Sequence, residues 1–446
     1  MVLGAVLLAR GSSLSPLEKC LVMIASAVLP MVVYSVVVDR VHRNPSTGLD
    51  WSSPRPWGEV WQTTRIKWLG LSAAVVCLGV VYFSVRYYRA AGFALYFEFF
   101  ERFSLWVLPL SLTYVAWVDR FMVKPRDGYW HAGQAVIGRW HEVDRAILRD
   151  FALAWAVKGF FLAFMASILT GPVNGFTDPG TWRNLAGHAA QVFSWGWVNE
   201  PNGVAQRLLP LVAALVAEVF FIDILFGGLG YIMTFRPLDT HIRSAHPTLL
   251  GWVAALSCYP PLTIMGNGMA LDYRQTPEWF YWFAGLPWLA LVWASLIVLL
   301  VAFYAWSTLV FGMRFSNLTH RGILTHGPYS LTKHPAYLTK VLFWWMVHMP
   351  FLNPDSRWEA LRNTLLLLFI SWVYWLRART EERHLRTDPV YEQYEAAIAA
   401  RHALLLTRIR KRLPNIGATS KTAGAEPDDG NRQDPSQEAL GATRLR

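Results

Sequence analysis

Nine long apolar segments constrain this chain more than any other feature of its sequence. They are residues 20–38, 68–85, 103–118, 151–171, 207–233, 249–268, 284–311, 336–352 and 362–377. A helix needs roughly 20 residues to cross the hydrocarbon core of a bilayer, whereas the strands of a membrane barrel alternate over about 10. Because backbone groups in lipid must find their hydrogen bonds within the chain, the segments predict an all-α fold: a polytopic transmembrane helical bundle of about nine spans.

The distribution of charge agrees with this prediction. Charged residues make up only 16% of the 446 residues and apolar ones 54%, which is too little charge to cover the surface of soluble domains. The net charge of +11 does not indicate a nucleic-acid partner, because the excess basic residues gather in certain loops and in the C-terminal tail. We therefore expect membrane lipids and no nucleic acid as partners. The three cysteines lie in apolar segments without the spacing of metal ligands, so no metal is predicted.

Basic residues also predict how the chain is oriented. Arg and Lys are frequent between the first and second segments, between the third and fourth, and after the fifth, seventh and ninth, whereas loops 172–206 and 270–278 carry very few. Basic loops usually remain in the cytoplasm. This predicts an outer N-terminus and a cytoplasmic C-terminus, in the inner membrane if the cell is bacterial. Arg86, Arg89 and Arg102 oppose the outer placement of their loop.

The stretch THRGILTHGPYSLTKHPAYLTKVLFWW, residues 319–345, is the most informative polar loop. Gly327 and Pro328 predict a turn. Pro335 predicts that the eighth span begins at His334 or Pro335, since proline is favoured at the first helical position. The polar and aromatic side chains of this loop are thereby placed together at one mouth of the bundle.

A second stretch, RARTEERHL at residues 377–385, leaves the ninth span on the same side. Its paired carboxylates, Glu381 and Glu382, are placed to meet Lys333 and the tyrosines of the first loop. Each stretch alone has a simpler explanation: a basic membrane flank in one case, and a solvated helix face with local ion pairs in the other. Their combination is more specific than either.

Together the two stretches resemble the signature of the isoprenylcysteine carboxyl methyltransferase and phospholipid methyltransferase superfamily. In that family a Gly-x-Tyr turn precedes Arg-His-Pro-x-Tyr at a helix start, the next helix ends in Glu-Glu, and a helix with tyrosine-rich ends follows. The matching residues here are Gly327, Tyr329, Lys333, His334, Pro335, Ala336, Tyr337, Glu381, Glu382 and YEQY at 391–394. The chain departs from the family at Lys333, which stands in place of arginine and cannot form the same bidentate contacts.

The resemblance covers residues 245–412 and implies three regions. Residues 245–412 would form a methyltransferase-like transmembrane core ending in a C-terminal amphipathic helix, because 380–412 is basic and has Glu, Arg and Leu at helical spacing. Residues 1–244 would form an N-terminal transmembrane region of unassigned role. Residues 413–446, rich in Gly, Asp, Ser, Gln and Pro, are predicted to be a disordered tail.

The resemblance also implies a cofactor, S-adenosyl-L-methionine. Its binding residues would be Arg321, Gly322, Ile323 and Leu324 through their backbone, and Tyr329, His334, Pro335 and Tyr337 as pocket lining. Glu382 would bind the donor's polar end, either its amino group or its ribose hydroxyls, with Glu381 beside it. Arg379 stands where the family has an arginine facing the acceptor, and it is the candidate catalytic residue. The acceptor would be a lipophilic small molecule, a lipid or a lipidated molecule that enters from the membrane.

Methyl transfer from this donor explains why the sequence displays little catalytic apparatus. A sulfonium is already activated, so the reaction needs in-line approach of a nucleophile, and correct orientation supplies much of the rate enhancement. Carboxylates and tyrosine rings suit a cationic ligand that carries an adenine. The family methylates carboxylates, amines and thiols, and the sequence does not select among them.

Three ionisable residues are predicted to lie within the membrane: Lys158, Glu218 and Asp223. Such groups are costly in lipid and are functional candidates by default. The alternative is an interhelical ion pair between Lys158 and one of the two carboxylates, which requires no substrate.

Two other functions are compatible with parts of the sequence. Sterol reductases that use a nicotinamide cofactor have a similar length and an Arg-His-x-Asn-Tyr signature. This chain instead has Pro335-Ala336-Tyr337 at the Asn-Tyr position and Leu338-Thr339-Lys340 where Gly-Asp usually follows. A non-enzymatic transporter or scaffold would use the three intramembrane charges as a polar path. The Glu-Glu pair favours the methyltransferase over both.

Overall fold

The computed structural model describes residues 14–264, 268–269 and 271–412. It has an all-α fold, as predicted, with a single short pair of strands among the described residues. The chain divides into two compact units, residues 1–398 and 399–446. The apolar helices and the candidate site belong to the first unit, and the predicted disordered tail lies outside the described residues.

Helices account for most of the described chain. The α-helices are α2 (Pro16–Val37), α3 (Trp57–Ser84), α4 (Ala94–Phe121), α5 (Gly128–Val136), α6 (Arg145–Thr177), α7 (Pro179–Phe193), α8 (Leu209–Ile232), α9 (Leu249–Leu256), α10 (Trp279–Trp282), α11 (Pro287–Phe311), α12 (Pro335–His348), α13 (Arg357–Leu385) and α14 (Pro389–Arg412). A π-helix, η7 (Val204–Leu208), leads into α8. The 3₁₀ helices are η1 (Val41–Arg43), η2 (Pro45–Thr47), η3 (Arg86–Arg89), η4 (Ala91–Phe93), η5 (Trp140–Glu142), η6 (Gly196–Asn199), η8 (Arg236–Leu238), η9 (Gly312–Arg314) and η10 (Gly327–Ser330). Strands β1 (Ser244–Ala245) and β2 (Thr319–His320) pair antiparallel, with Ser244 opposite His320.

Five helices are long and apolar enough to cross a membrane. They are Pro16–Val37, Trp57–Ser84, Arg145–Thr177, Val204–Ile232 and Pro287–Arg314. These helices coincide with five of the predicted spans, namely 20–38, 68–85, 151–171, 207–233 and 284–311. Their length and composition indicate a membrane protein.

The predicted count of about nine spans is not confirmed. The predicted span 249–268 is too long, because α9 has only 8 residues and Pro260 and Pro261, which lack the N–H that a helix needs, follow shortly after it. Helix α12 covers the predicted span 336–352 with 14 residues, or about 21 Å at 1.5 Å per residue. A hydrocarbon core is roughly 30 Å thick, so α12 alone does not cross it.

The predicted spans 103–118 and 362–377 lie within the long helices α4 and α13. Charged residues bound the apolar part of each helix closely, Arg102 and Asp119 in α4 and Arg362 in α13 being examples. These and other polar side chains lower the mean hydropathy of both helices, and neither is among the helices apolar enough to cross a membrane. Neither helix therefore ranks with the five above.

Local sequence signals explain where several helices begin. Ser15 caps α2, and Glu18 completes a capping box with it. Asp144 accepts hydrogen bonds from the first amides of α6, and Ser356 does the same for α13. Helix α12 begins at Pro335, as predicted, with His334 at the position before it.

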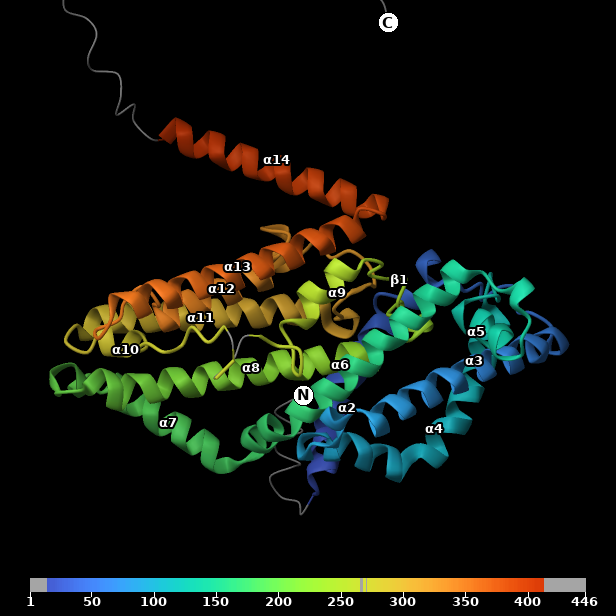
Figure 1. The fold of residues 1–446 in the computed structure, drawn as a ribbon, viewed down its shortest axis with the longest axis horizontal. Coiled ribbons are helices and arrows are strands. Elements are labelled where there is room, and N and C mark those ends of the chain that lie inside the picture. The colour runs from blue at the N-terminus through green and yellow to red at the C-terminus, as the bar shows by residue number, and fades with distance from the viewer. Residues whose placement is uncertain (1–13, 265–267, 270, 413–446) are drawn as a thin grey trace, which may run out of the picture. The chain divides into compact units, whose positions relative to one another are not determined.

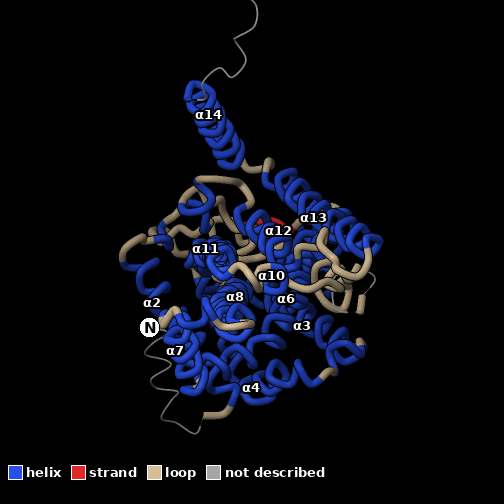
Figure 2. The backbone as a smooth tube through the Cα atoms, turned by 90° about the vertical axis from the view of Figure 1, so that its left-hand side faces the viewer, coloured by secondary structure: helices blue, strands red, loops and turns tan. Residues whose placement is uncertain are grey.

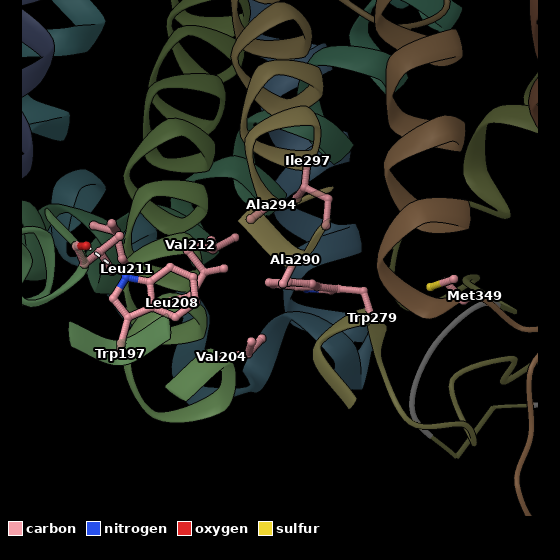
Figure 3. Packing of buried hydrophobic residues seen from close by; sticks show 11 residues of the cluster. Trp197, Val204, Leu208, Leu211, Val212, Trp279, Ala290, Ala294, Ile297 and Met349 are labelled. Atoms are coloured by element: carbon pink, nitrogen blue, oxygen red, sulfur yellow. Dashed lines mark hydrogen bonds between the residues drawn. The ribbon is translucent and has the colours of Figure 1, made fainter. Parts of the chain in front are cut away.

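Helix α8 packs against α6, α7 and α11, and α11 in turn packs against α12 (Figures 1 and 2). Figure 3 shows the apolar cluster that joins η7 and α8 to α11. Ala290 and Ala294, one turn apart on α11, are fully buried there, and such small side chains let helices approach closely. This packing sets α11 beside α12, and the polar loop 312–334 connects their ends.

A buried cluster of charges joins α3, α4 and α5. The Lys67 ammonium of α3 lies 2.6 Å from the Asp119 carboxylate of α4 and 3.5 Å from that of Asp127. Arg55 approaches Asp119 to 3.4 Å, and the Thr63 hydroxyl donates to it. Lys67 and Asp119 are almost completely inaccessible to solvent. We refer to these five residues as the N-terminal charge cluster.

Candidate functional site

The two sequence stretches singled out above meet at the start of α12 and the end of α13. Gly327 adopts a φ of 59°, a backbone conformation that favours glycine, and Pro328 follows it in η10. The turn buries Tyr329. The Tyr394 hydroxyl of α14 donates to the Tyr329 carbonyl at 2.6 Å and ties the turn to the first helical turns after α13.

Glu382 is the centre of an ion-pair network. One carboxylate oxygen, Oε1, lies 2.8 Å from the Lys333 ammonium and accepts a 3.1 Å hydrogen bond from His334 Nε2. The other oxygen, Oε2, lies 3.4 Å from Arg379 and 3.7 Å from Arg386. The carboxylate thus joins α13 to the residues that start α12.

Burial alone would raise the pKa of the Glu382 carboxyl. The hydrogen bonds from His334 and Lys333, and their positive charge, outweigh burial and lower that pKa to about 2. Glu395 belongs to the same network, because it lies 2.8 Å from both Lys333 and Arg386, and these contacts lower its pKa to about 2 as well. Both carboxyls are therefore ionised at neutral pH. We refer to Lys333, His334, Glu382, Arg386 and Glu395 as the C-terminal charge cluster.

Three cavities lie beside this cluster. The first has about 630 Å³ of empty volume including its open mouth, and it extends between α11, α12 and α13. The second, of about 560 Å³, lies under the loop 314–324 and is closed by Leu385, Tyr391 and Tyr394. The third is smaller, about 340 Å³, and lies against α9.

The first and second cavities adjoin each other. They share the lining residues Phe311, Ser316, Tyr329, Lys333, His334 and Glu381. Glu381 lines all three cavities, and its carboxylate accepts a 2.8 Å hydrogen bond from the Tyr337 hydroxyl. Glu382 lines none of the three, because successive helix residues point about 100° apart. Glu381 is thus exposed to the cavities, while Glu382 holds together the elements around them.

The structure places all four predicted backbone contacts, Arg321 to Leu324, on the wall of the second cavity. The Arg321 side chain is buried. Its guanidinium donates to the carbonyls of Gly230 at 2.6 Å, Met233 at 2.6 Å and Thr240. The Gly230 carbonyl belongs to the last turn of α8, and Met233 is the residue that follows the helix. No further helical amides are present there to satisfy these carbonyls. Arg321 therefore caps α8, and this anchors the loop that lines the cavity.

Two hydroxyl groups on the wall of the second cavity have no hydrogen-bond partner among the described residues. They are the hydroxyls of Tyr391 and Thr319, and both are buried. A buried hydroxyl without a partner is unusual and destabilising. Because both residues line this cavity, the two hydroxyls are candidate hydrogen-bond partners for a ligand.

Two arginines on α13 have different surroundings. Arg379, the predicted catalytic residue, has a 55% exposed side chain, pairs with Glu382 and lies over the Trp375 ring. It lines none of the three cavities. Arg377 is buried and lines the first and third cavities. Its guanidinium lies 4.9 Å from the centre of the Tyr337 ring, near those of Tyr259 and Tyr374 as well.

Several lining residues of the first cavity were not predicted. They are Tyr259, Tyr304, Asn317, Lys340, Tyr374 and Arg377. Among the predicted site residues, Pro335 is buried at the start of α12 and lines none of these three cavities, whereas Tyr329, His334 and Tyr337 line the first. A polar residue inside an apolar segment, such as Lys340 or Arg377, was a signal that the sequence did offer.

The intramembrane carboxylate Asp223 lies next to the first cavity rather than beside Lys158. It accepts hydrogen bonds from Tyr304 at 2.7 Å and Thr308 at 2.5 Å, two residues that line this cavity. Lys158 lies 4.9 Å from the Trp155 ring centre. Within the described part of the chain it forms no ion pair with Glu218 or Asp223, so the predicted interhelical pair is wrong. Asp223 finds neutral hydroxyl donors on α11 instead.

No family model, no curated protein and no solved structure matches this chain at a significant level.

Proposed function

We propose that the chain is an integral membrane methyltransferase that uses S-adenosyl-L-methionine and methylates a lipophilic acceptor. The observation that carries the proposal is the pair of adjoining cavities that meet at Glu381, His334 and Lys333. A group transfer between two molecules needs two sites with a common boundary, so that the reacting atoms can approach in line.

The second cavity fits the methyl donor. Tyr329, Tyr391 and Tyr394 supply aromatic surface for an adenine, and the unpartnered hydroxyls of Tyr391 and Thr319 offer hydrogen bonds to its polar atoms. When bound, the donor supplies a methyl group that its sulfonium has already activated. The Glu381 carboxylate at the shared boundary attracts positive charge there, and Tyr337 fixes its orientation.

The first cavity fits a lipophilic acceptor. It is lined by Tyr304 and Thr308 of α11, one of the five apolar helices, and by α12 and α13. Its rings provide apolar surface, while Arg377 and Lys340 give it two basic groups. We assign to Arg377, rather than to Arg379, the role of the arginine that faces the acceptor, because only Arg377 lines this cavity.

The basic loops around the site support a cytoplasmic location. Arg236 and Arg243 lie in the loop after α8, and Arg314 and Lys333 lie in the loop after α11, which lines the second cavity. Basic loops of membrane proteins usually remain in the cytoplasm. We therefore propose that the donor site and the C-terminus face the cytoplasm, where this donor is available.

Calorimetric titration of the detergent-purified full chain tests the proposal. We expect S-adenosylhomocysteine to bind and NADPH not to bind. Transfer of a labelled methyl group into a total membrane lipid extract is the matching activity assay. Binding of NADPH without binding of S-adenosylhomocysteine would show a reductase instead. Absence of both, with the protein shown to be folded by its thermal transition, would favour a transporter or scaffold.

A further inference from the structure

Arg314, in η9 after α11, is a guanidinium on the wall of the second cavity. It does not line the first cavity, so it lies on the part of the second cavity that the two do not share. Its Nη2 atom lies 2.9 Å from the Asp239 carboxylate, and about a quarter of its side chain is exposed. Among the described residues its other guanidinium nitrogens form no hydrogen bond.

The surroundings of Arg314 carry an excess of positive charge. Arg243 pairs with the same carboxylate, Asp239, at 3.2 Å, so two guanidiniums share one negative charge. Arg321 lies beside them and is bonded to carbonyls, with no carboxylate partner among the described residues. Burial and the neighbouring charge of Arg236, followed by those of Arg243 and Arg321, lower the pKa of His241 to about 3. A site with surplus positive charge selects an anionic group.

Gly322 gives this charge access to the cavity. Its φ of 113° is a conformation that other residues rarely adopt. A Cβ atom at this position would lie 3.4 Å from Arg314 Nη1 and 3.6 Å from Arg243 Nη2. The two guanidiniums therefore lie against bare backbone on the cavity wall, and no side chain at 322 covers them.

Asp239 connects this wall to the N-terminal region. Besides the two arginines it accepts hydrogen bonds from the Ser46 hydroxyl at 2.8 Å and the Asn44 amide at 3.3 Å. Its side chain is buried. The carboxylate is thus fixed by residues far from it in sequence, and it fixes Arg314 in turn.

We propose that the Arg314 guanidinium binds the carboxylate of the methionine part of the donor, and that Asp239 is the positioning residue that holds it. This inference rests on the proposed function, since it names the contact for one group of that donor. Guanidinium and carboxylate form paired, charge-assisted hydrogen bonds. The ammonium group of the same amino-acid part is then directed toward Glu381, the carboxylate that lines the same cavity.

The test compares two ligands that differ only in the amino-acid part. S-adenosylhomocysteine carries the carboxylate, whereas methylthioadenosine keeps the adenosine and the sulfur but lacks that part. Both are titrated into the detergent-purified full chain and into its Arg314→Gln variant. We expect the substitution to weaken binding of S-adenosylhomocysteine about 10- to 100-fold, as for loss of a charged hydrogen-bonded pair. The affinity for methylthioadenosine should differ by less than about twofold between Arg314→Gln and wild type, because this ligand has no carboxylate to contact Arg314.

Further variants separate this contact from a general loss of charge or of folding. Arg236→Gln removes a neighbouring guanidinium that lines neither cavity. It lowers the positive charge of the region without removing a ligand contact, so both affinities should fall by less than about twofold. Asp239→Asn should lower the affinity for S-adenosylhomocysteine more than that for methylthioadenosine, as Arg314→Gln is expected to do. On the wild-type chain, the carboxamide analogue of S-adenosylhomocysteine should bind as weakly as the acid binds to Arg314→Gln. This last comparison needs no variant to fold.

The outcomes are distinguishable. One outcome is that the wild-type chain binds S-adenosylhomocysteine, but Arg314→Gln either weakens the binding of both ligands equally or changes neither. The proposed carboxylate contact is then wrong, while the proposed function stands. If the wild-type chain binds neither of the two, the proposed function fails and takes this inference with it. Binding of NADPH, weakened by Arg314→Gln, would assign the same arginine to a nucleotide phosphate and overturn the carboxylate contact.

Discussion

The chain contains two buried charge clusters, and they differ in what surrounds them. In the N-terminal cluster the Lys67 ammonium and the Asp119 carboxylate are enclosed by α3, α4 and α5, and none of its residues lines the three cavities. In the C-terminal cluster, Lys333 and His334 line two cavities while bonded to Glu382. Both clusters hold helices together, but only the second also presents side chains to a ligand.

The two clusters differ in whether their charges border a cavity. Burial of charge by itself therefore does not identify a functional site. Breaking either cluster by removing one partner leaves an uncompensated buried charge, which is destabilising wherever it occurs. A functional role requires in addition that the same groups border a space that a ligand can occupy. Ligand affinity therefore separates the two clusters, whereas stability does not.

Glu382→Ala, in the C-terminal charge cluster, should have the largest effect, because it changes both the stability of the chain and its affinity for the ligand. Lys333 and His334 lose their common carboxylate, and the start of α12 loses its link to α13. We expect a loss of stability of about 3–5 kcal/mol and a fall in affinity for S-adenosylhomocysteine of about 100-fold or more. Thermal unfolding and calorimetry measure the two effects. Unchanged affinity in a folded variant would contradict a link between this cluster and the donor site.

Lys67→Met, in the N-terminal charge cluster, should lower stability without changing ligand affinity. Asp119 would remain buried without its closest cation, so we expect a loss of stability of about 3–5 kcal/mol. Affinity for S-adenosylhomocysteine should stay within about twofold of wild type at a temperature where the variant is folded. The double variant Lys67→Met with Asp119→Asn should recover part of the stability. A selective loss of ligand affinity would show that the N-terminal cluster is coupled to the site.

Acid should destabilise the C-terminal region in two steps. Burial, and then the positive charge of His246 and His320, lower the pKa of His384 from 6.5 to about 4. Its contribution to stability is complete above pH 6.5 and is lost as the pH falls toward 4. The contributions of Glu382 and Glu395, whose pKa values fall from 4.5 to about 2, are lost only between those values.

Melting temperatures between pH 8 and pH 4, which span the first step, check this expectation. His384→Gln should remove an acid destabilisation on the order of 2 kcal/mol between pH 6.5 and 4. Arg386→Gln in the neighbouring exposed ion pair is the control and should keep the acid step. A variant His384→Gln with an unchanged pH profile would assign the step to other groups.

Tyr391→Phe should have the smallest effect on stability, and it tests directly whether a ligand forms a hydrogen bond with the Tyr391 hydroxyl. The removed hydroxyl has no partner among the described residues, so stability should be unchanged or slightly higher. Affinity for S-adenosylhomocysteine should fall by about fivefold to tenfold, as for a lost neutral hydrogen bond. Tyr394→Phe is the matched variant. It loses the bond to the Tyr329 carbonyl and should lower stability by about 1 kcal/mol.

Much of the fold was predictable because the signals were local. Five apolar runs correspond to helices of spanning length, and Pro335 begins α12 as its position before an apolar run predicts. Helix length was less predictable where an apolar run continued past a helix end. The segment 249–268 resembles a span because Leu, Val, Ala and Ile lie on both sides of its two prolines, yet α9 ends at Leu256.

The sequence by itself determined that this chain has helices long and apolar enough to cross a membrane. It also determined that residues 321–337 and 379–385 lie at the same end of the bundle. Only the tertiary structure decided which side chains face the cavities: Glu381 but not Glu382, and Arg377 but not Arg379. The physical reason is that the rotation of a helix about its axis depends on packing against distant elements. The contact between Asp239 and Arg314 shows the same dependence, because it joins residues 75 positions apart in a sequence that gives no local sign of it.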